Sequence, residues 1–452
     1  MTNQPASGRG PVPNVPGDAG MSRRRFMAWG TAGAALAAVG SSSLIAACSS
    51  GSTAAKSSGG GISGTISFLS WDTLAISQPL VSLFQKAHPN VQVQVEFENP
   101  NTYISTLATR LASGTAPDIF IYTAQNKASL NAGDYVLDLT GQDSTKVMAA
   151  ANRNFMSNAG KVYGFSPASW ASGPIWNLQL LDKVGGTPPA TWDEFIELGH
   201  KLKGLGVTPY SDAAQLGTIL EGLLGSYFTA QGLLAPGHVL GIEADTRIFS
   251  GQSTFAAEWL TPLQMYNQLY TEGLIPSSVV SLTGAEFDSE LANGQLGALG
   301  SGPWDVTAVQ QDNPKVPLKM LPVPGAQAGQ EFWCGAPNQG WAVNSKSKNL
   351  DAAVAFVNWL ATPEALQNYA KLSGDIITTT NYESPVPSSL TETAQAARSS
   401  NYYFTGISWP TQYSELLGDV AIAQVNQMIQ GKASPQQVLG AMDTEVQKLR
   451  SS

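Results

Sequence analysis

The regular alternation of strand and helix patterns over residues 65–122 is the feature that most limits how this chain can fold. Residues 65–72 alternate between apolar and polar types, and residues 91–97 (VQVQVEF) do so strictly, as strands with one buried face do. A third, short apolar strand covers residues 117–122. Helical patterns separate the three strands at residues 80–88 and 103–113. This order predicts an α/β fold that begins with a doubly wound parallel sheet.

The predicted carboxyl ends of these strands carry aromatic and polar side chains. Ligands of open α/β sheets bind in the crevice outside such strand ends. The candidate contact residues at these ends are Trp71, Asp72, Tyr122, Gln125 and Asn126. The neutral amides of Gln125 and Asn126 favour an uncharged ligand.

A second candidate site is the stretch Gly297–Asp305, where a short apolar strand is followed by Gly-Ser-Gly-Pro and then by Trp304. Glycine at a strand exit lets the backbone approach a ligand closely, and Pro303 restricts the turn that presents Trp304. Asp305 follows directly. A buried turn whose tryptophan fills the core is the alternative that these residues leave open, because tryptophan is highly buried on average.

The remainder of the chain continues the alternation of helices and strands. Thr191-Trp192-Asp193-Glu194 has the residues of a capping box, which predicts a helix that runs to about Lys203. Thr362 and Ser434, each followed by proline, predict two more helix starts. We expect other helices at residues 216–230, 255–270, 287–294 and 351–360, and strands at residues 208–210, 315–323 and 340–344. We interpret three tryptophans as core residues: Trp192, Trp259 and Trp359.

Composition limits the classes of partner. The chain has 452 residues, of which 43% are hydrophobic and 13% charged, so it has the apolar content to bury a sizeable core. Its net charge of −9 becomes −12 without residues 1–47, which hold four arginines and one aspartate. An acidic body argues against nucleic acid and anionic membrane surfaces as partners.

The N-terminus has the layout of an export signal with a lipid attachment site. Twin arginines in Ser22–Met27 precede a modestly apolar run over residues 28–47, which ends in Ile-Ala-Ala and Cys48. This ending is similar to a lipobox, in which the thiol of Cys48 would carry a diacylglycerol and anchor the exported protein to the outer face of the membrane. The Gly/Ser-rich residues 49–64 would then form a flexible tether. Met1 and Met21 are both possible starts.

No motif for catalysis, metal binding or a cofactor stands out in the sequence. The three histidines are scattered, and no His/Cys/Asp/Glu spacing indicates a metal site. There is no nucleophile elbow, phosphate-binding loop or dinucleotide fingerprint. Of the two cysteines, Cys48 is assigned to the lipobox, so Cys334 is expected to be a buried free thiol.

Seven short stretches, in this order, resemble the extracellular solute-binding proteins of family 1, the substrate-capture lipoproteins of ABC importers for sugars. Each is weak alone, but the resemblance runs in this order from Ile66 to near the C-terminus, over about 380 residues. They are Phe84–Pro89, Leu111–Ile119, Tyr163–Phe165, Pro189–Phe195, Gly294–Trp304, Asn344–Asn349 and Ala352–Phe356. One departure is Ile175–Leu178, where the family usually reads Tyr-Asn-Lys, which puts any role of a lysine there in doubt.

The resemblance implies a two-lobed periplasmic-binding-protein-like fold of type II, with a sheet flanked by helices in each lobe. The N-terminal lobe would comprise residues 65–172 and 341–388, and the C-terminal lobe residues 173–331 and 389–450. Hinge crossovers would lie near residues 170–174, 332–340 and 385–392.

The resemblance also implies which residues contact a sugar between the lobes. These would be Tyr122, Gln125, Asn126, Trp170, Tyr210 and Trp304, with Trp341 and Trp409 as further walls. The apolar face of a pyranose suits flat aromatic rings, and its hydroxyls suit amide and carboxylate partners. We expect Tyr122, Gln125 and Trp170 to face Trp304 across the gap.

The implied function is capture of a sugar or oligosaccharide by hinge closure and its delivery to the permease subunits of an ABC transporter. The resemblance implies no catalysis, metal or cofactor, and we expect a monomer. Two alternatives stay open: an extracytoplasmic carbohydrate-active enzyme, and a binding protein for a non-sugar solute such as a polyamine or glycerol phosphate. A charged cluster in the cleft would favour the non-sugar solute.

Overall fold

The computed structural model describes residues 62–212, 216–235, 237–238, 240, 242–282 and 284–451. The predicted export signal, Cys48 and the tether up to residue 61 lie outside the described residues. Within the described part, no helix combines the length and the apolar character needed to cross a membrane. All described residues belong to one compact unit.

The first sheet is built mainly from the strands that the sequence predicts at residues 65–122. Its strand order is β11-β3-β1-β2, with β1 parallel to both β2 and β3 and with β11 antiparallel to β3. The strands are β1 (Gly64–Ser70), β2 (Val91–Phe97), β3 (Ile119–Tyr122) and β11 (Gly340–Val343). The predicted parallel start is therefore confirmed, and the bounds of β2 are those expected from its alternation.

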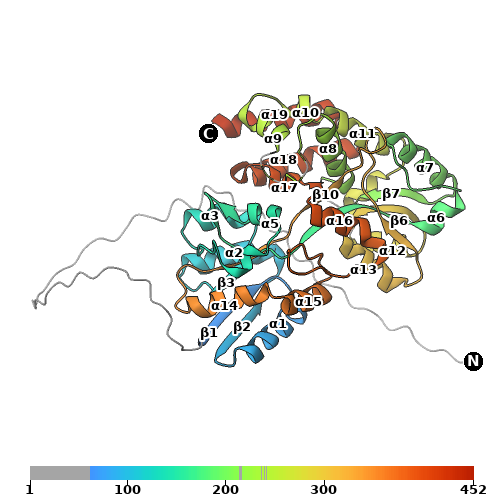
Figure 1. Cartoon of the computed structure of the whole chain (residues 1–452). Coiled ribbons are helices and arrows are strands. Elements are labelled where there is room, and N and C mark those ends of the chain that lie inside the picture. The colour runs from blue at the N-terminus through green and yellow to red at the C-terminus, as the bar shows by residue number, and fades with distance from the viewer. Residues whose placement is uncertain are drawn as a thin grey trace, which may run out of the picture. The chain divides into compact units, whose positions relative to one another are not determined.

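Helices cover this sheet and form the first lobe with it (Figure 1). They are α1 (Leu74–Ala87), α2 (Pro100–Ala112), α3 (Ala124–Ala132), α4 (Asp143–Lys146), α5 (Ala150–Phe155), α14 (Leu350–Leu360) and α15 (Pro363–Ser373). A short hairpin of β4 (Ser157–Asn158) and β5 (Lys161–Val162) follows α5. Phe84 of α1 packs edge-to-face on Phe356 and Trp359 of α14, which fixes these helices to one another.

The second sheet has β6 at its centre. Its order is β12-β10-β6-β8-β7, and β9 also pairs with β6. Strands β10, β8 and β9 run antiparallel to β6, whereas β7 is parallel to β8. The strands are β6 (Ser169–Asn177), β7 (Thr208–Asp212), β8 (Leu296–Ser301), β9 (Leu318–Met320), β10 (Trp333–Pro337) and β12 (Tyr402–Tyr403).

The helices around this sheet make up the second lobe. They are α6 (Leu178–Lys183), α7 (Trp192–Gly204), α8 (Thr218–Ala230), α9 (Glu243–Ser250), α10 (Phe255–Glu258), α11 (Leu260–Thr271), η2 (Ser277–Ser281), α12 (Gly284–Ala292), α13 (Pro303–Asp312), η3 (Ser388–Leu390), α16 (Thr391–Ser399), α17 (Thr405–Ser408), α18 (Thr411–Ile429) and α19 (Pro435–Ser451). The capping box of Thr191 and Glu194 is present at the start of α7. Trp192, Trp259 and Trp359 are buried, as expected for core residues.

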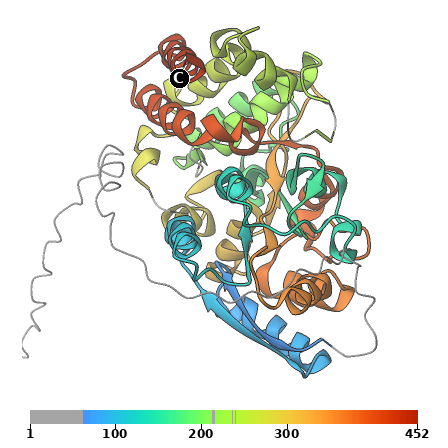
Figure 2. The same ribbon diagram turned by 90° about the vertical axis from the view of Figure 1, so that its left-hand side faces the viewer.

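Three segments of the chain connect the two sheets, and they are hydrogen-bonded to one another. The segment before β6 meets the segment between β10 and β11 where the N–H of Asn338 donates to the carbonyl of Ala168 at 2.9 Å. It meets the segment after α15 through Thr378, whose N–H donates to the carbonyl of Pro167 at 2.9 Å. Figure 2 shows the two lobes from the side, with the orange strands between them. The connections therefore form one narrow bundle.

Candidate functional site

A cavity of about 830 Å³ lies between elements of the two sheets and is the main candidate site. Its volume falls in the upper part of the range of small-molecule sites, roughly 300–1,000 Å³. The first sheet contributes side chains that follow β1 and β3, and the second sheet contributes the faces of β6 and β10, the start of α8 and the start of α13. The cavity thus lies partly at the predicted ends of β1 and β3 and partly on a face of the second sheet.

Alternate residues of β6 and β10 form the floor of the cavity. Trp170 and Ser172 of β6 line it, whereas Ala171 between them does not. On β10, Cys334 and Ala336 line it in the same way and pair with Ser172 and Trp170. This pattern arises because successive side chains of a strand point to opposite faces of the sheet. The sheet therefore fixes the positions of these side chains through its backbone register.

An aromatic cluster stands over this floor. The ring of Trp170 lies 6.0 Å from that of Trp304 at 67° and 5.3 Å from that of Phe404 at 70° (centroid distances), both edge-to-face arrangements. Trp304 is 56% exposed, which is unusual for a large aromatic residue. Pro303 is the first residue of α13, a favoured position for proline, so the predicted turn is in fact a helix start that presents Trp304.

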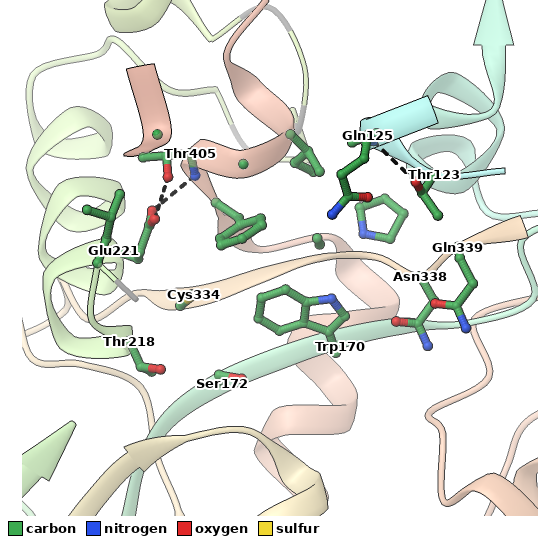
Figure 3. A pocket seen from close by; sticks show the side chains of 18 of the residues that line it. Thr123, Gln125, Trp170, Ser172, Thr218, Glu221, Cys334, Asn338, Gln339 and Thr405 are labelled. Carbon is green, nitrogen blue, oxygen red and sulfur yellow. Dashed lines mark hydrogen bonds between the residues drawn. The ribbon is translucent and has the colours of Figure 1, made fainter. Parts of the chain in front are cut away.

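The end of the cavity nearest the first lobe is polar and uncharged. Gln125 lies in the first turn of α3, where Thr123 and Asn126 form a capping box. This cap fixes the start of α3. The side-chain oxygen of Thr123 accepts a hydrogen bond from the backbone N–H of Asn126, and the side-chain oxygen of Asn126 accepts one from the backbone N–H of Thr123. Asn338 and Gln339, between β10 and β11, complete this end (Figure 3).

The opposite end of the cavity contains a buried carboxyl group. Glu221 of α8 is 2% exposed and accepts hydrogen bonds from the N–H of Thr405 at 3.1 Å and from its hydroxyl at 2.6 Å. Loss of solvent on burial raises the pKa of Glu221 to about 8, and the charges of Asp245 and Asp212 add to this effect. Figure 3 shows Glu221 and Thr405 on the far side of Trp170 from Gln125. The two ends of the cavity therefore differ in chemistry.

Six of the eleven predicted contact residues line the cavity. They are Trp71, Gln125, Trp170, Trp304, Asp305 and Trp409. The ring of Trp71 packs against Tyr103 at 5.5 Å, and that of Trp409 packs against Trp259 at 5.8 Å, so each has one side fixed by the core. Asp305 accepts a short hydrogen bond from the hydroxyl of Ser301, and burial raises its pKa.

The structure corrects the placement of Tyr122, Asn126 and Asp72. Tyr122 is 1% exposed, and its hydroxyl accepts a hydrogen bond from the side-chain amide of Asn131 at 2.7 Å. Asn126 is buried because it caps its own helix and donates to the carbonyl of Ile121 at 2.9 Å. Asp72 follows Trp71 but is not among the residues that line the cavity.

Tyr210 and Trp341 are also core residues rather than cavity walls. Tyr210 is fully buried, and its ring stacks on that of Phe195 with a centroid distance of 4.1 Å. Its hydroxyl donates a hydrogen bond to the backbone carbonyl of Phe195. Trp341 is 3% exposed and packs edge-to-face on Tyr369 at 5.2 Å. Both lie within strands, where alternation turns every second side chain away from the cleft.

Several cavity residues were not predicted from the sequence, among them Ser172, Glu221, Cys334, Asn338, Phe404 and Thr405. Glu221 does have a sequence signal, since it is the single charged residue in the apolar helix Thr218–Ala230. A lone acid in such a helix is costly to bury without a special environment. Phe404 and Thr405 have no comparable signal, because they reach the cavity through contacts with residues far away in the sequence, such as that of Thr405 with Glu221. In the described residues, no group of His, Cys, Asp and Glu could hold a metal ion.

Comparisons with known proteins match this geometry. A family model described as "Bacterial extracellular solute-binding protein" matches residues 69–367. The chain is 24% identical over 318 residues to the multiple sugar-binding protein of Streptococcus mutans, covering 66% of this chain and 71% of that protein. It is also 24% identical over 299 residues to the melibiose/raffinose/stachyose-binding protein MelE of Bacillus subtilis, covering 65% and 68%.

Solved structures agree in fold. A family 1 extracellular solute-binding protein from Bifidobacterium longum subsp. infantis superposes with a TM-score of 0.74 at 29% identity, covering 86% of this chain and 100% of that one. The predicted two-lobed fold is thereby confirmed. Because the family model spans about two thirds of the chain, this protein belongs to the bacterial extracellular solute-binding proteins.

Proposed function

We propose that this protein binds a sugar or oligosaccharide in the cavity and delivers it to an ABC importer. The observation that carries the proposal is the exposed ring of Trp304 beside Trp170, which itself packs against Phe404. Flat aromatic faces suit the apolar C–H face of a pyranose, and the amides of Gln125 and Asn338 suit its hydroxyls. Relatives whose names state binding of multiple sugars, or of melibiose, raffinose and stachyose, support this ligand class.

We propose that capture occurs by closure of the two lobes about the three connecting segments. The lobes would comprise residues 65–172 with 341–388 and residues 173–331 with 389–450, and hinges would lie near 170–174, 332–340 and 385–392. A ligand that touches Gln125 of one lobe and Trp304 of the other favours the closed state, because only closure lets it make both contacts.

In this proposal the protein acts outside the cytoplasm as a monomer. A diacylglycerol on Cys48 would hold it at the outer face of the cytoplasmic membrane, near the permease subunits that receive the ligand. Family membership supports export. The acidic charge of −9 supports a partner other than nucleic acid.

Catalysis is not part of the proposal. The named relatives are binding proteins, and the chain carries no catalytic motif found by sequence. Incubation of the purified protein with oligosaccharides, followed by chromatography, is expected to return the sugars intact. Cleaved products would instead favour a carbohydrate-active enzyme.

A thermal-shift screen over mono- and oligosaccharides tests the proposal. A ligand that binds only the folded state stabilises it, by about 2.7 kcal/mol when its concentration is 100 times the Kd. We expect at least one sugar to raise the melting temperature in a concentration-dependent way. No rise with any sugar, but a rise with polyamines or glycerol phosphate, would contradict the sugar assignment.

A further inference from the structure

The acidic residues that line the cavity are not balanced by positive charge. Glu221, Asp305 and Asp419 line the cavity, while no Lys, Arg or His is among the described residues that do so. Asp245 and Asp212 lie close enough to Glu221 to raise its pKa. Asp245 is 1% exposed and has the hydroxyl of Tyr403 as a donor at 3.1 Å. Three acidic groups, Glu221, Asp245 and Asp212, are thus gathered at one end of the site, where a bound cation would favour their charged forms.

Thr405 is the one described residue that donates hydrogen bonds to Glu221, and it leaves acceptor positions of this carboxyl group open to a ligand. The N–H and hydroxyl of Thr405 each donate to a different carboxylate oxygen. A cation beside Glu221 lowers the pKa of this carboxyl group and so favours its ionised form. An ionised carboxylate has about four acceptor positions, so two directions stay available to a donor from the cavity. Charge-assisted hydrogen bonds from a cation are the strongest that such a group makes.

A second, independent observation at this end is the hydroxyl of Ser172. Ser172 is 1% exposed and lines the cavity from β6, opposite Cys334 of β10. Its oxygen has no hydrogen-bond partner among the described residues. Buried hydroxyls are normally paired, so an unpaired one in a binding cavity indicates that a ligand group completes it.

We propose that the ligand is an amino sugar or an oligosaccharide that contains one, with its ammonium group held at the end of the cavity formed by Glu221 and Ser172. The neutral part of the sugar lies across Trp170 toward the amides of Gln125 and Asn338, so the cavity fixes the direction in which the ligand is bound. This inference rests on the proposed function and narrows it to a charged subclass. The sequence favours an uncharged ligand because Gln125 and Asn126 are neutral. The acidic residues that the structure brings to the cavity favour a cationic one instead.

Matched pairs of sugars test this inference by thermal shift and calorimetry at pH 7. Each pair consists of a neutral sugar of the gluco or galacto series, from one to four rings, and its 2-amino-2-deoxy counterpart, with the N-acetylated form as a neutral analogue of similar size. We expect the amino member to bind about tenfold or more tightly than its neutral partners. Equal or weaker binding of the amino members, while neutral sugars bind, overturns the inference and leaves the proposed function intact.

Two further outcomes separate the inference from the function on which it rests. If no sugar stabilises the protein, neutral or aminated, the proposed function fails, and the inference fails with it. If putrescine, a diamine without a sugar ring, stabilises the protein as much as the amino sugars do, the ring is not recognised and the inference is overturned.

Three variants locate the preference on the protein. Glu221→Gln, which keeps the shape of the side chain, is expected to abolish the preference for the amino member. Ser172→Ala removes only the unpaired hydroxyl, so it is expected to fold at least as well as the unchanged protein and to weaken binding of the amino sugar several-fold. Asp182→Asn removes an equal charge from an exposed position on α6 and is expected to keep the preference. A preference retained in both cavity variants, or lost in Asp182→Asn, overturns the inference.

Discussion

Replacement of Trp304 by alanine is expected to weaken sugar binding by about 30-fold or more while leaving the folded protein intact. The binding effect follows because a large aromatic residue that forms the centre of a site typically contributes 2 kcal/mol or more, and about 1.4 kcal/mol corresponds to tenfold in Kd. The stability of the free protein changes little, because Trp304 is 56% exposed and surface substitutions usually stay within about 0.5 kcal/mol.

Calorimetric titration with a sugar found in the screen measures the first effect, and the melting temperature of the free protein measures the second. Trp259→Ala is the matched control, because Trp259 is fully buried and does not line the cavity. It is expected to destabilise the fold by about 3–5 kcal/mol. Unchanged affinity in Trp304→Ala would remove Trp304 from the site.

The free protein is expected to lose stability as the pH rises from 5 to 8. Burial raises the pKa of Glu221 from 4.5 to about 8 and that of Asp245 from 3.8 to about 6. Glu221 in the folded chain therefore keeps its proton between about pH 4.5 and 8, and Asp245 between about pH 3.8 and 6, whereas the unfolded chain has already released both protons. Unfolding then releases protons, so the free energy of unfolding falls with rising pH and levels off above pH 8.

The fall due to Glu221 is on the order of a few kcal/mol, since one pKa unit corresponds to about 1.4 kcal/mol. Denaturant unfolding at pH 5, 6, 7, 8 and 9 measures it. Glu221→Gln removes the titration of this side chain but keeps that of Asp245, so its stability curve is expected to be flatter, not flat, over this window. Parallel curves for the two proteins would contradict the assignment of the effect to Glu221.

The sequence predicts the first sheet well because its strands alternate over enough residues to define a period. The structure confirms β2 with the bounds that were expected. The first helix is the main difference, since it begins at Leu74 rather than near Leu80. Pro79 lies inside the helix, where a proline removes one helical hydrogen bond, so the residues before Leu80 carry a weak helical signal.

The candidate site was only partly predictable, for a related reason. Gly302-Pro303-Trp304 is a local signal, and the helix start that it forms does present Trp304 at the cavity. Tyr210 and Trp341 lie in strands, where a shift of one residue decides between core and cleft, and the sequence does not contain that register. Contacts such as Thr405 with Glu221 join segments 184 residues apart and follow only from the complete fold.

The most direct test of the central claim is a crystal structure of the protein with a sugar identified by the screen. We predict a sugar ring in contact with Trp304 and Trp170, with polar contacts from Gln125 of the other lobe. A sugar bound elsewhere, or one that contacts a single lobe and leaves Trp304 exposed, would contradict capture between the lobes.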